Sequence, residues 1–365
     1  MRVLVLDTIH GGATLAEALV RYGDEVVAVD VYRGGVPTVS EVEDDNYDVI
    51  TAPVHLDADF PLLHTKVPVI THHEMTARLA EDYQVKLIEI TGARGKTTTA
   101  FAVASILSGR GILHTSAGTF LYPEKELLFR KSITPASLLF ALDAASKIGA
   151  EWVVAEESIG VSGAGCLGIL TSENTYRIAS GKKDALSEKM TCLNRCRHTL
   201  LPEDVRKLVS VHDNCIVSPA GSFENPLIEI PVYRAALQTA AAAASILGVS
   251  VKPLEQFSAV PGRMQLLEEG GVFVLDNSNS GTTVENTLEA AAYLQQVAGK
   301  PVILVVGEGA HAVCEGLTGR DSIPEKDFAA VIPAEGRVFD ELKNEAVSLA
   351  KERDASVLLA VKTWR

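Results

Sequence analysis

Short apolar runs alternate with segments of helical spacing along the first eighty residues of the chain. The runs typical of buried strands are Val3–Leu6, Val26–Val31, Tyr47–Ala52 and Val67–Ile70, and helical spacing is clearest at Ala13–Tyr22. Strands that alternate with helices form a parallel sheet with helices on its faces. The pattern therefore predicts an α/β domain in this region.

The same alternation starts again twice further along the chain. A polar gap at 81–84 precedes a second block, whose strands are Val85–Ile90, Trp152–Ala155 and Leu167–Leu170 and whose alanine-rich helix covers 235–247. A third block follows Pro261-Gly262, with strands at Val272–Leu275, Val302–Val306, Ala330–Ile332 and Ser356–Val361. We expect three α/β domains, at residues 1–84, 85–255 and 256–365, that hinge about a shared cleft.

Composition and charge narrow the classes of function. The 365 residues are 47% hydrophobic and 22% charged, which is typical of a globular protein. A formal net charge of −14 argues against a general nucleic-acid binder and against a protein that binds anionic membranes. The five scattered cysteines favour a reduced compartment, and we recognise neither a signal peptide nor a membrane-spanning segment. We therefore expect a cytoplasmic protein with no nucleic-acid or membrane partner, whose oligomeric state is not indicated.

A nucleotide-binding loop is the strongest chemical signal. The strand that ends at Ile90 runs into Thr91-Gly92-Ala93-Arg94-Gly95-Lys96-Thr97-Thr98, and the threonines open a helix. Glycines allow a tight turn whose N–H groups point at phosphate oxygens, and the helix N-terminus adds positive potential. Lys96 is suited to neutralise the terminal phosphates, and the Thr97 hydroxyl is suited to hold Mg²⁺. The expected ATP-binding residues are Gly92, Ala93, Arg94, Gly95, Lys96, Thr97 and Thr98.

A carboxylate is needed to complete a magnesium site next to such a loop. The strand Trp152–Ala155 runs directly into Glu156-Glu157-Ser158. The C-terminal end of a buried parallel strand is where ligands bind in α/β sheets, so Glu156 is the candidate metal ligand together with Thr97. The alternative is that these carboxylates only form a solvated strand end.

Five short motifs together resemble the Mur ligase family, the ATP-dependent ligases of peptidoglycan and folylpolyglutamate synthesis. The loop reads TG-x-x-GKT-T, and Glu156-Glu157-Ser158 matches an E-x-S element. The other three motifs are Ser132-Ile133-Thr134-Pro135, Val260-Pro261-Gly262-Arg263-Met264 and Val274-Leu275-Asp276-Asn277-Ser278. The resemblance implies an N-terminal Rossmann-like substrate-binding domain, a central P-loop ATP-binding domain and a C-terminal Rossmann-like domain that completes the ATP site.

The same resemblance implies roles for residues outside the loop. Arg263 and Asp276 are expected to reach the nucleotide from the C-terminal domain on closure, and Gln238 replaces the asparagines of a nucleotide-contacting helix. Many members carry a carbamylated lysine, for which Lys182, Lys183 and Lys189 are candidates, with Lys189 the best spaced. Lys96, Glu156, Arg263 and Lys189 are thus the candidate catalytic residues.

Two departures from the family pattern bear on the substrate. The family places a histidine after the strand that here ends at Leu170, but Thr171–Arg177 contains none. The N-terminal motifs at 7–12 and 71–75 resemble instead a branch that acts on a nickel tetrapyrrole. That branch is expected to activate a propionate as an acyl phosphate and to close a carbocyclic ring, without an amine. The expected substrate-binding residues are Thr8, His10, Gly11, Gly12, His72 and His73.

Alternatives to this interpretation remain open at the level of sequence. The chain could be a Mur-type amide ligase that joins an amino acid to a carboxylate, or a P-loop protein that senses nucleotide without ligation. The N-terminal histidines could provide an axial imidazole or hydrogen bonds to a tetrapyrrole, or could be ordinary surface histidines. Cys192, Cys196 and His198 could form a metal site with both thiols on one helical face, or could simply be buried.

Overall fold

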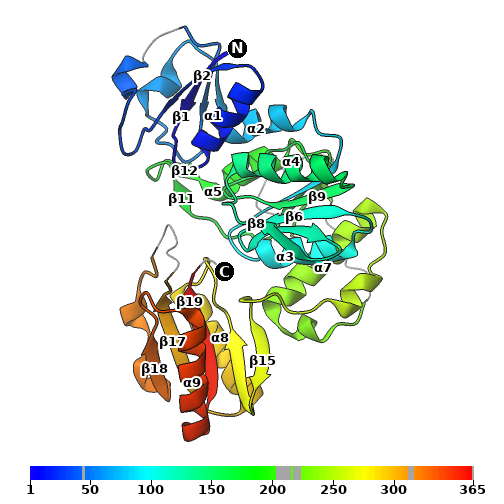
Figure 1. Cartoon of the computed structure of the whole chain (residues 1–365), viewed down its shortest axis with the longest axis vertical. Coiled ribbons are helices and arrows are strands. Elements are labelled where there is room, and N and C mark those ends of the chain that lie inside the picture. The colour runs from blue at the N-terminus through cyan, green and yellow to red at the C-terminus, as the bar shows by residue number, and fades with distance from the viewer. Residues whose placement is uncertain (43–45, 203–214, 217–222, 311–315, 364–365) are drawn as a thin grey trace. The chain divides into compact units, whose positions relative to one another are not determined.

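In the computed structural model the chain separates into two compact units, Met1–Phe257 and Ser258–Arg365 (Figure 1). The structure describes residues 1–42, 46–202, 215–216, 223–310 and 316–363. The predicted boundaries at 84/85 and 255/256 stay predictions. Within the described residues, no helix is long and apolar enough to cross a membrane.

The N-terminal sheet has four parallel strands in the order β2-β1-β3-β4. They are β1 (Arg2–Leu6), β2 (Glu25–Val29), β3 (Val49–Ala52) and β4 (Val69–Thr71), and helices α1 (Gly12–Arg21) and α2 (His72–Ala80) follow β1 and β4. Side chains alternate across β1, with Val3 and Val5 packed against the helices and Leu4 and Leu6 in a second core on the other face. Both faces of β1 are therefore buried, as expected for a parallel sheet.

The central sheet has eight strands in the order β14-β13-β10-β5-β9-β6-β7-β8. The strands are β5 (Lys86–Thr91), β6 (Gly111–Thr115), β7 (Gly118–Tyr122), β8 (Glu126–Phe129), β9 (Trp152–Glu156), β10 (Leu167–Leu170), β13 (Thr199–Leu200) and β14 (Cys215–Ile216). Its helices are α3 (Lys96–Ile106), α4 (Leu138–Ile148), α5 (Ala185–Leu193) and α7 (Pro231–Leu247), and a small hairpin pairs β11 (Arg177–Ile178) with β12 (Lys183–Asp184). The pairings from β14 to β6 are parallel, and those of β6-β7-β8 are antiparallel.

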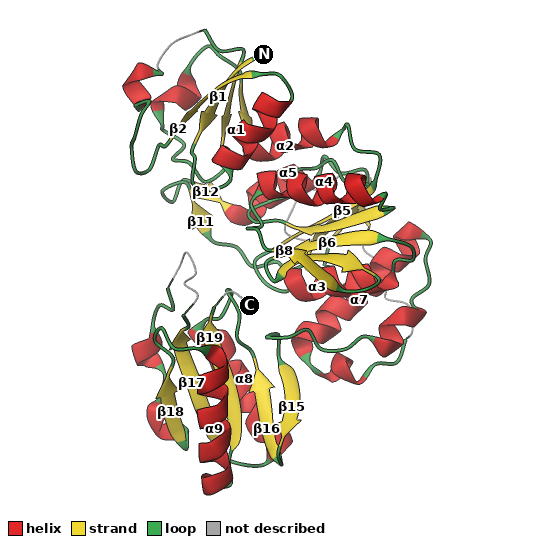
Figure 2. Cartoon of the chain, in the orientation of Figure 1, coloured by secondary structure: helices red, strands yellow, loops and turns green. Residues whose placement is uncertain are grey.

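One hydrophobic core joins the N-terminal sheet to the central sheet. Leu15 and Leu19 of α1, Met75 of α2 and Leu138 and Leu142 of α4 are all buried in it. Helices α1, α2 and α4 lie between the two sheets (Figure 2). This shared core explains why the first two predicted domains form a single compact unit.

The second unit is a five-stranded sheet with one helix on each face. Its strand order is β15-β16-β19-β17-β18, from β15 (Gln265–Glu269), β16 (Val272–Asp276), β17 (Val302–Glu308), β18 (Ala330–Pro333) and β19 (Ser356–Lys362). Helix α8 (Val284–Ala298) packs Ala290 and Leu294 on one face, and α9 (Phe339–Arg353) packs Leu342 and Ala346 on the other. Only the β15–β16 pairing is antiparallel among the described strands of this unit.

Seven short 3₁₀ helices connect these elements in the described part of the chain. They are η1 (Val39–Glu41), η2 (Pro61–His64), η3 (Pro135–Ser137), η4 (Pro226–Glu229), η5 (Lys252–Gln256), η6 (Arg320–Ser322) and η7 (Glu325–Asp327).

Differences from the predicted elements have local causes. The strand predicted to reach Val31 ends at Val29, because the Asp30 carboxylate accepts the backbone N–H groups of Tyr32 and Arg33 and starts a turn. The fourth strand begins at Val69 rather than Val67, and Pro68 has no N–H to donate within a sheet. Strands β6, β7, β8 and β15, which form the antiparallel pairings, were not predicted, because such short runs show no strong hydrophobic period.

Candidate active site

The loop between β5 and α3 has the geometry of a phosphate-binding loop. Gly92 adopts φ +151°, and a Cβ there would lie 2.1 Å from Thr171 Oγ1, so only glycine fits. Gly95 is the left-handed N-cap of α3, and its helix N-terminus has no side-chain cap among the described residues. The first N–H groups of α3 are thus positioned to bind an anion.

We expect Gly92→Ala to abolish nucleotide binding and to lower thermal stability. The added Cβ clashes with Thr171, and the backbone conformation disfavours alanine, at a combined cost of about 1–3 kcal/mol. Calorimetric titration with ATP and thermal unfolding would measure both effects. Gly149→Ala is the matched control, because Gly149 has φ +65° and a Cβ added there would meet nothing within 4 Å. Equal ATP affinity in the two variants would contradict the prediction.

Oxygen ligands for a divalent cation converge at the end of β9. Glu156 is buried, and its Oε2 accepts the Thr97 hydroxyl at 2.9 Å and the Ser116 N–H at 3.0 Å. The Thr97 and Ser116 hydroxyl oxygens lie 3.2 Å apart. One carboxylate and two hydroxyls on three different elements are the hard oxygen donors that Mg²⁺ prefers, so the residues fit the predicted metal. Ser116 was not predicted, since its place beside Glu156 depends on the β6–β9 pairing.

Lys96 lies at the mouth of this oxygen cluster. Its Nζ donates to the Gly92 carbonyl at 3.2 Å and is 3.9 Å from Glu156 Oε1. The side chain is 18% exposed, so the ammonium group is close to the metal ligand yet remains reachable by solvent. A phosphate bound at the N-terminus of α3 would find this cation beside it.

The segment after β10, which lacks the family histidine, holds the loop in place. Ser172 Oγ accepts the N–H groups of Ala93 and Arg94, at 3.0 and 3.1 Å. Thr171 donates its hydroxyl to the Arg94 carbonyl at 2.5 Å. No sequence motif signals these contacts, and only the parallel pairing of β5 with β10 brings Ser172 to the loop.

The three candidate lysines occupy different environments. Lys189 on α5 has no exposed surface, and its Nζ has no hydrogen-bond partner among the described residues, while the Tyr176 ring centroid lies 4.8 Å away. Burial, and then the positive charge of Lys96, lower the pKa of Lys189 to about 8. Lys182 instead forms ion pairs with Asp57 and Asp59, and Lys183 lies 3.7 Å from Glu188. Lys189 is thus the buried amine beside the P-loop lysine.

A buried histidine on β6 lies two residues before Ser116, which is in the turn between β6 and β7. His114 Nε2 faces the Ser132 carbonyl at 3.1 Å, and Nδ1 faces the Thr119 hydroxyl at 2.8 Å. Because a carbonyl only accepts, Nε2 carries the proton and Nδ1 accepts from Thr119. Burial lowers the pKa of His114 to about 4 despite the nearby Glu156 carboxylate. The histidine therefore stays neutral near pH 7.

We expect thermal stability to fall as the pH is lowered from 6.5 toward 4. Between pH 6.5 and 4 the imidazole takes up a proton in the unfolded chain but not in the folded chain, so acid favours unfolding. For His114 the loss in the free energy of unfolding reaches about 3 kcal/mol below pH 4. Burial also lowers the pKa of His55, His72 and His73, so they act in the same direction. Melting temperatures across this range should decline less steeply for His114→Gln than for the unmodified chain. Parallel declines would rule out this role of His114.

The predicted substrate residues surround the C-terminal end of β1. Thr8 follows β1 by two residues, and the side chain of His10 is 45% exposed beside buried Asp7. A Cβ on Gly11 would lie 2.6 Å from Thr134 Oγ1, so this loop is in contact with the Ser132–Pro135 motif, which lies next to the central sheet. Gly12 is the first residue of α1.

The two remaining substrate candidates are buried rather than open to a ligand. His72 and His73 begin α2 and are at most 2% exposed. His73 Nε2 faces the Ser158 carbonyl at 3.3 Å, while His72 Nε2 has no hydrogen-bond partner among the described residues. Burial lowers the pKa of His72 to about 3 and that of His73 to about 4, so both are neutral near pH 7. Their contact with substrate stays a prediction.

The C-terminal unit brings its own two candidates to one end of the β15–β16 hairpin. Arg263 precedes β15, whose first residue, Gln265, pairs with Asp276. Asp276 is buried and accepts the Ser278 N–H at 3.0 Å. Gln238 lies in the first unit, on an exposed position of α7. Nucleotide contacts by these three residues stay predictions.

The cysteine pair does not lie on one helical face, so that prediction was wrong. Helix α5 ends at Leu193, and Cys196 lies in the turn that follows, where its Sγ is 3.6 Å from Glu89 Oε2. Both Cys192 and Cys196 are buried free thiols. Among the described His, Cys, Asp and Glu residues, the three whose ligand atoms lie close enough together to hold a metal ion are instead Asp7, His10 and His55.

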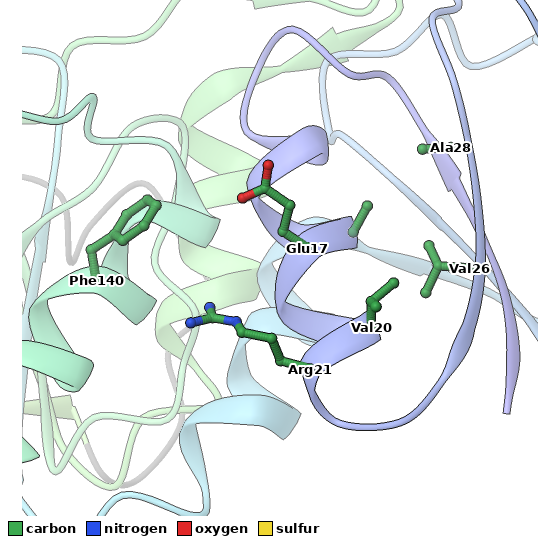
Figure 3. Close-up of a pocket in the computed structure, with 7 residues that line it drawn as sticks. Glu17, Val20, Arg21, Val26, Ala28 and Phe140 are labelled. Carbon is green, nitrogen blue, oxygen red and sulfur yellow. The ribbon is translucent and has the colours of Figure 1, made fainter.

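A groove of about 500 Å³ lies away from all predicted site residues (Figure 3). It is lined by Ala16, Glu17, Val20, Arg21, Val26, Ala28 and Phe140. Figure 3 shows Glu17 and Arg21 on one helix facing Phe140, with apolar side chains on the other side. Glu17 and Arg21 are the charged side chains of this lining, which has no hydroxyl groups like those of Thr97 and Ser116 beside Glu156.

Comparisons with known proteins agree with this geometry. A family model described as "Coenzyme F430 synthetase CfbE, C-terminal domain" matches residues 266–332. The chain is 31% identical to coenzyme F(430) synthetase from Methanosarcina acetivorans over 87% of this chain and 85% of that protein. The fold is similar to that of folylpolyglutamate synthase from Thermotoga maritima, with TM-score 0.54, 14% identity, and coverage of 80% of this chain and 90% of that one. It is also similar to MurF from Acinetobacter baumannii, with TM-score 0.51, 16% identity, and coverage of 82% and 79%. The predicted Mur-ligase-like α/β architecture is thereby confirmed.

Proposed function

The chain belongs to the coenzyme F(430) synthetase family, and from this premise we propose that it completes coenzyme F(430) by an ATP-dependent ring closure. The substrate is a nickel tetrapyrrole acid, whose propionate is activated as an acyl phosphate and then attacked by a carbon of the macrocycle. The observation that carries the ATP-dependent step is the convergence of Lys96, Thr97 and Glu156 at the phosphate-binding loop. These three side chains form the expected site for the terminal phosphates of ATP and for Mg²⁺.

Phosphoryl transfer solves the chemical problem posed by the carboxylate. A carboxylate is a poor electrophile, because its leaving group would be oxide. Attack of a propionate oxygen on the γ-phosphorus of ATP forms the acyl phosphate and releases ADP. A carbon atom of the ring then bonds to the acyl carbon, phosphate leaves with the original carboxylate oxygen, and the attacking carbon loses its proton. The net result is a ketone and the loss of one water from the substrate.

Each loop residue has a defined task in the first step. The N–H groups at the start of α3 hold the phosphates, while Lys96 compensates the charge that shifts toward the bridging oxygen. When bound, Mg²⁺ supplies electrostatic stabilisation of the transferring phosphoryl group, and Glu156, Thr97 and Ser116 would hold it. We propose that Arg263 and Asp276 also contact the nucleotide, as the family resemblance implies, and that water is kept from the acyl phosphate during the reaction.

The loop after β10 supports a carbon nucleophile rather than an amine. In this chain Thr171 and Ser172 bind the P-loop backbone, and the segment from Thr171 to Arg177 contains no histidine. In the amide ligases of the Mur family such a histidine serves the second metal, in the half of the site that activates the amine. A ring-closing enzyme has no free amine to bind at that position.

The decisive experiment measures phosphate release with ATP and Mg²⁺, with and without the seco-tetrapyrrole acid and with no amine added. We expect phosphate to appear only with the acid, and the product to be lighter than the substrate by one water. Turnover that begins only after an amino acid is added, with a product heavier than the acid, would establish an amide ligase instead. ATP binding without turnover under either condition would identify a nucleotide-sensing protein.

A further inference from the structure

An aspartate–histidine pair presents one imidazole nitrogen at the C-terminal edge of the N-terminal sheet. Asp7 follows β1, is fully buried, and adopts φ +88°, a conformation that few aspartates tolerate without a reason. Its carboxylate accepts the backbone N–H groups of Ile9 and His10 at 2.6 and 3.0 Å. Its Oδ2 also lies 3.0 Å from His10 Nδ1. The carboxylate thus fixes both the loop and the histidine ring.

The tautomer of His10 follows from this contact. A carboxylate only accepts hydrogen bonds, so the proton of the neutral ring lies on Nδ1. Nε2 then carries the lone pair, and it has no hydrogen-bond partner among the described residues. A carboxylate behind one nitrogen and an open lone pair on the other is the arrangement typical of metal-ligating histidines. The side chain is 45% exposed, which leaves the lone pair accessible to a ligand.

Two further rings, those of His55 and Tyr32, pack against the His10 imidazole and fix its orientation. His55 packs against it edge to face at 4.6 Å between ring centroids, and Tyr32 does so at 5.1 Å. His55 and Tyr32 are themselves nearly parallel, at 6.0 Å and 13°. Burial raises the pKa of Tyr32 to about 12, so its phenol stays protonated and carries no charge. The rings of His10, His55 and Tyr32 form an aromatic wall, which suits a flat conjugated ligand.

We propose that His10 Nε2 is an axial ligand to the nickel ion of the tetrapyrrole substrate. This inference rests on the proposed function, because the metal arrives with the substrate. Nickel(II) in a tetrapyrrole has four nitrogen ligands in one plane and open axial positions, and imidazole is a suitable donor for it. Asp7 is a positioning residue that fixes the orientation of the ring. The Gly11 contact with Thr134 brings this ligand to the side of the sheet that meets the central ATP-binding sheet.

A bare metal ion chelated by Asp7, His10 and His55 is the competing interpretation. The ligand atoms of these three residues lie within 4.8 Å of one another. However, the Asp7 carboxylate already accepts three N–H groups, two of them from the backbone, and these would have to be given up or shared. The geometry therefore favours Asp7 behind the histidine rather than on the metal.

The test is an absorption titration of the nickel seco-tetrapyrrole acid with protein, in the absence of ATP. We expect the wild-type chain to shift the visible bands as nickel gains an axial nitrogen, and His10→Ala to abolish the shift. Added imidazole should restore the shift in His10→Ala, because the free base refills the vacated axial position. Asp7→Asn keeps the shape of the side chain but removes its charge, and should weaken binding of the nickel seco-tetrapyrrole acid by roughly 10-fold. His64→Ala is the matched control, since His64 bonds to the Ala58 carbonyl on the surface.

The outcomes separate this inference from the proposed function. An unchanged band shift in His10→Ala, with native circular dichroism, would overturn the axial ligand. Calorimetric binding of Ni²⁺ alone that is lost in both His55→Ala and His10→Ala, with no band shift of the tetrapyrrole, would also overturn it in favour of chelation. A band shift in the wild-type chain without ATP-dependent turnover would support His10 as the axial ligand and would reject ring closure as the function.

Discussion

Lys96→Ala is expected to lower substrate-dependent phosphate release by on the order of 10²–10³-fold while the chain stays folded. The Lys96 ammonium is the cation beside Glu156 in the phosphate-binding loop, at 3.9 Å, and it donates a hydrogen bond to the Gly92 carbonyl. Removing it deletes charge stabilisation of phosphoryl transfer but little packing, because the side chain is partly exposed. The measurement is the steady-state rate of phosphate release with ATP and the seco acid.

Lys147→Ala is the matched control for this substitution. Lys147 is an exposed lysine in the last turn of α4, and its replacement should leave the rate within about 2-fold of the unmodified chain. A Lys96→Ala chain with near-normal turnover would reject the loop as the catalytic ATP site. Because every ligase interpretation needs this lysine, the result tests the ATP site and not the identity of the nucleophile.

The parts of the site that follow one another along the chain were predictable from sequence. A strand, a glycine-bearing turn and a helix are contiguous in Thr91–Thr98, and Gly92 and Gly95 stand where the backbone needs positive φ. Glu156 was predictable for the same reason. It ends a buried strand, and the C-terminal ends of parallel strands are where α/β sheets bind ligands. In both cases the local chain determines where the side chain points.

Contacts between distant segments were not predictable. Ser172 reaches the loop only because β10 pairs with β5, and Ser116 reaches Glu156 only because β6 pairs with β9. Asp7 was visible as a residue after β1, but the hydrogen bond that sets the His10 tautomer requires the left-handed turn seen in the structure. A single sequence does not show which strands pair or in which register, so it could not indicate these contacts.

The choice among the three lysines likewise needed the fold. Spacing favoured Lys189, but spacing cannot distinguish a buried amine from one that is paired at the surface. In the structure Lys182 and Lys183 have carboxylate partners, whereas Lys189 is enclosed, and the charge that acts most strongly on its pKa belongs to another lysine, Lys96. Burial and Lys96 lower the pKa of Lys189 more than Asp184 raises it, so the buried ammonium group is costly, and this cost indicates a chemical modification or a ligand.

Lys189→Ala is expected to reduce turnover by on the order of 10²-fold or more, because we propose that Lys189 carries a carbamate. The neutral amine attacks CO₂ to give the carbamate and one proton, which turns an uncompensated buried cation into an anion beside Lys96. The pKa of about 8 leaves part of the amine neutral near pH 8, so carbamate formation should increase as the pH rises from 7 toward 8. The carbamate would then be available as a further oxygen ligand near the nucleotide.

Carbon-13 NMR with labelled bicarbonate tests this without relying on activity. The unmodified chain should show a carbamate resonance that Lys189→Ala lacks and that Lys183→Ala retains, since Lys183 is a partly exposed lysine that lies near Glu188. Acetate should partly restore turnover in Lys189→Ala, because a small carboxylate can enter the space left by the side chain. A carbamate signal that persists without Lys189, or full activity of Lys189→Ala, would show that the buried amine serves packing alone. In that case Lys96 would act without an anionic neighbour other than Glu156, and metal binding would depend on the Thr97–Glu156 pair.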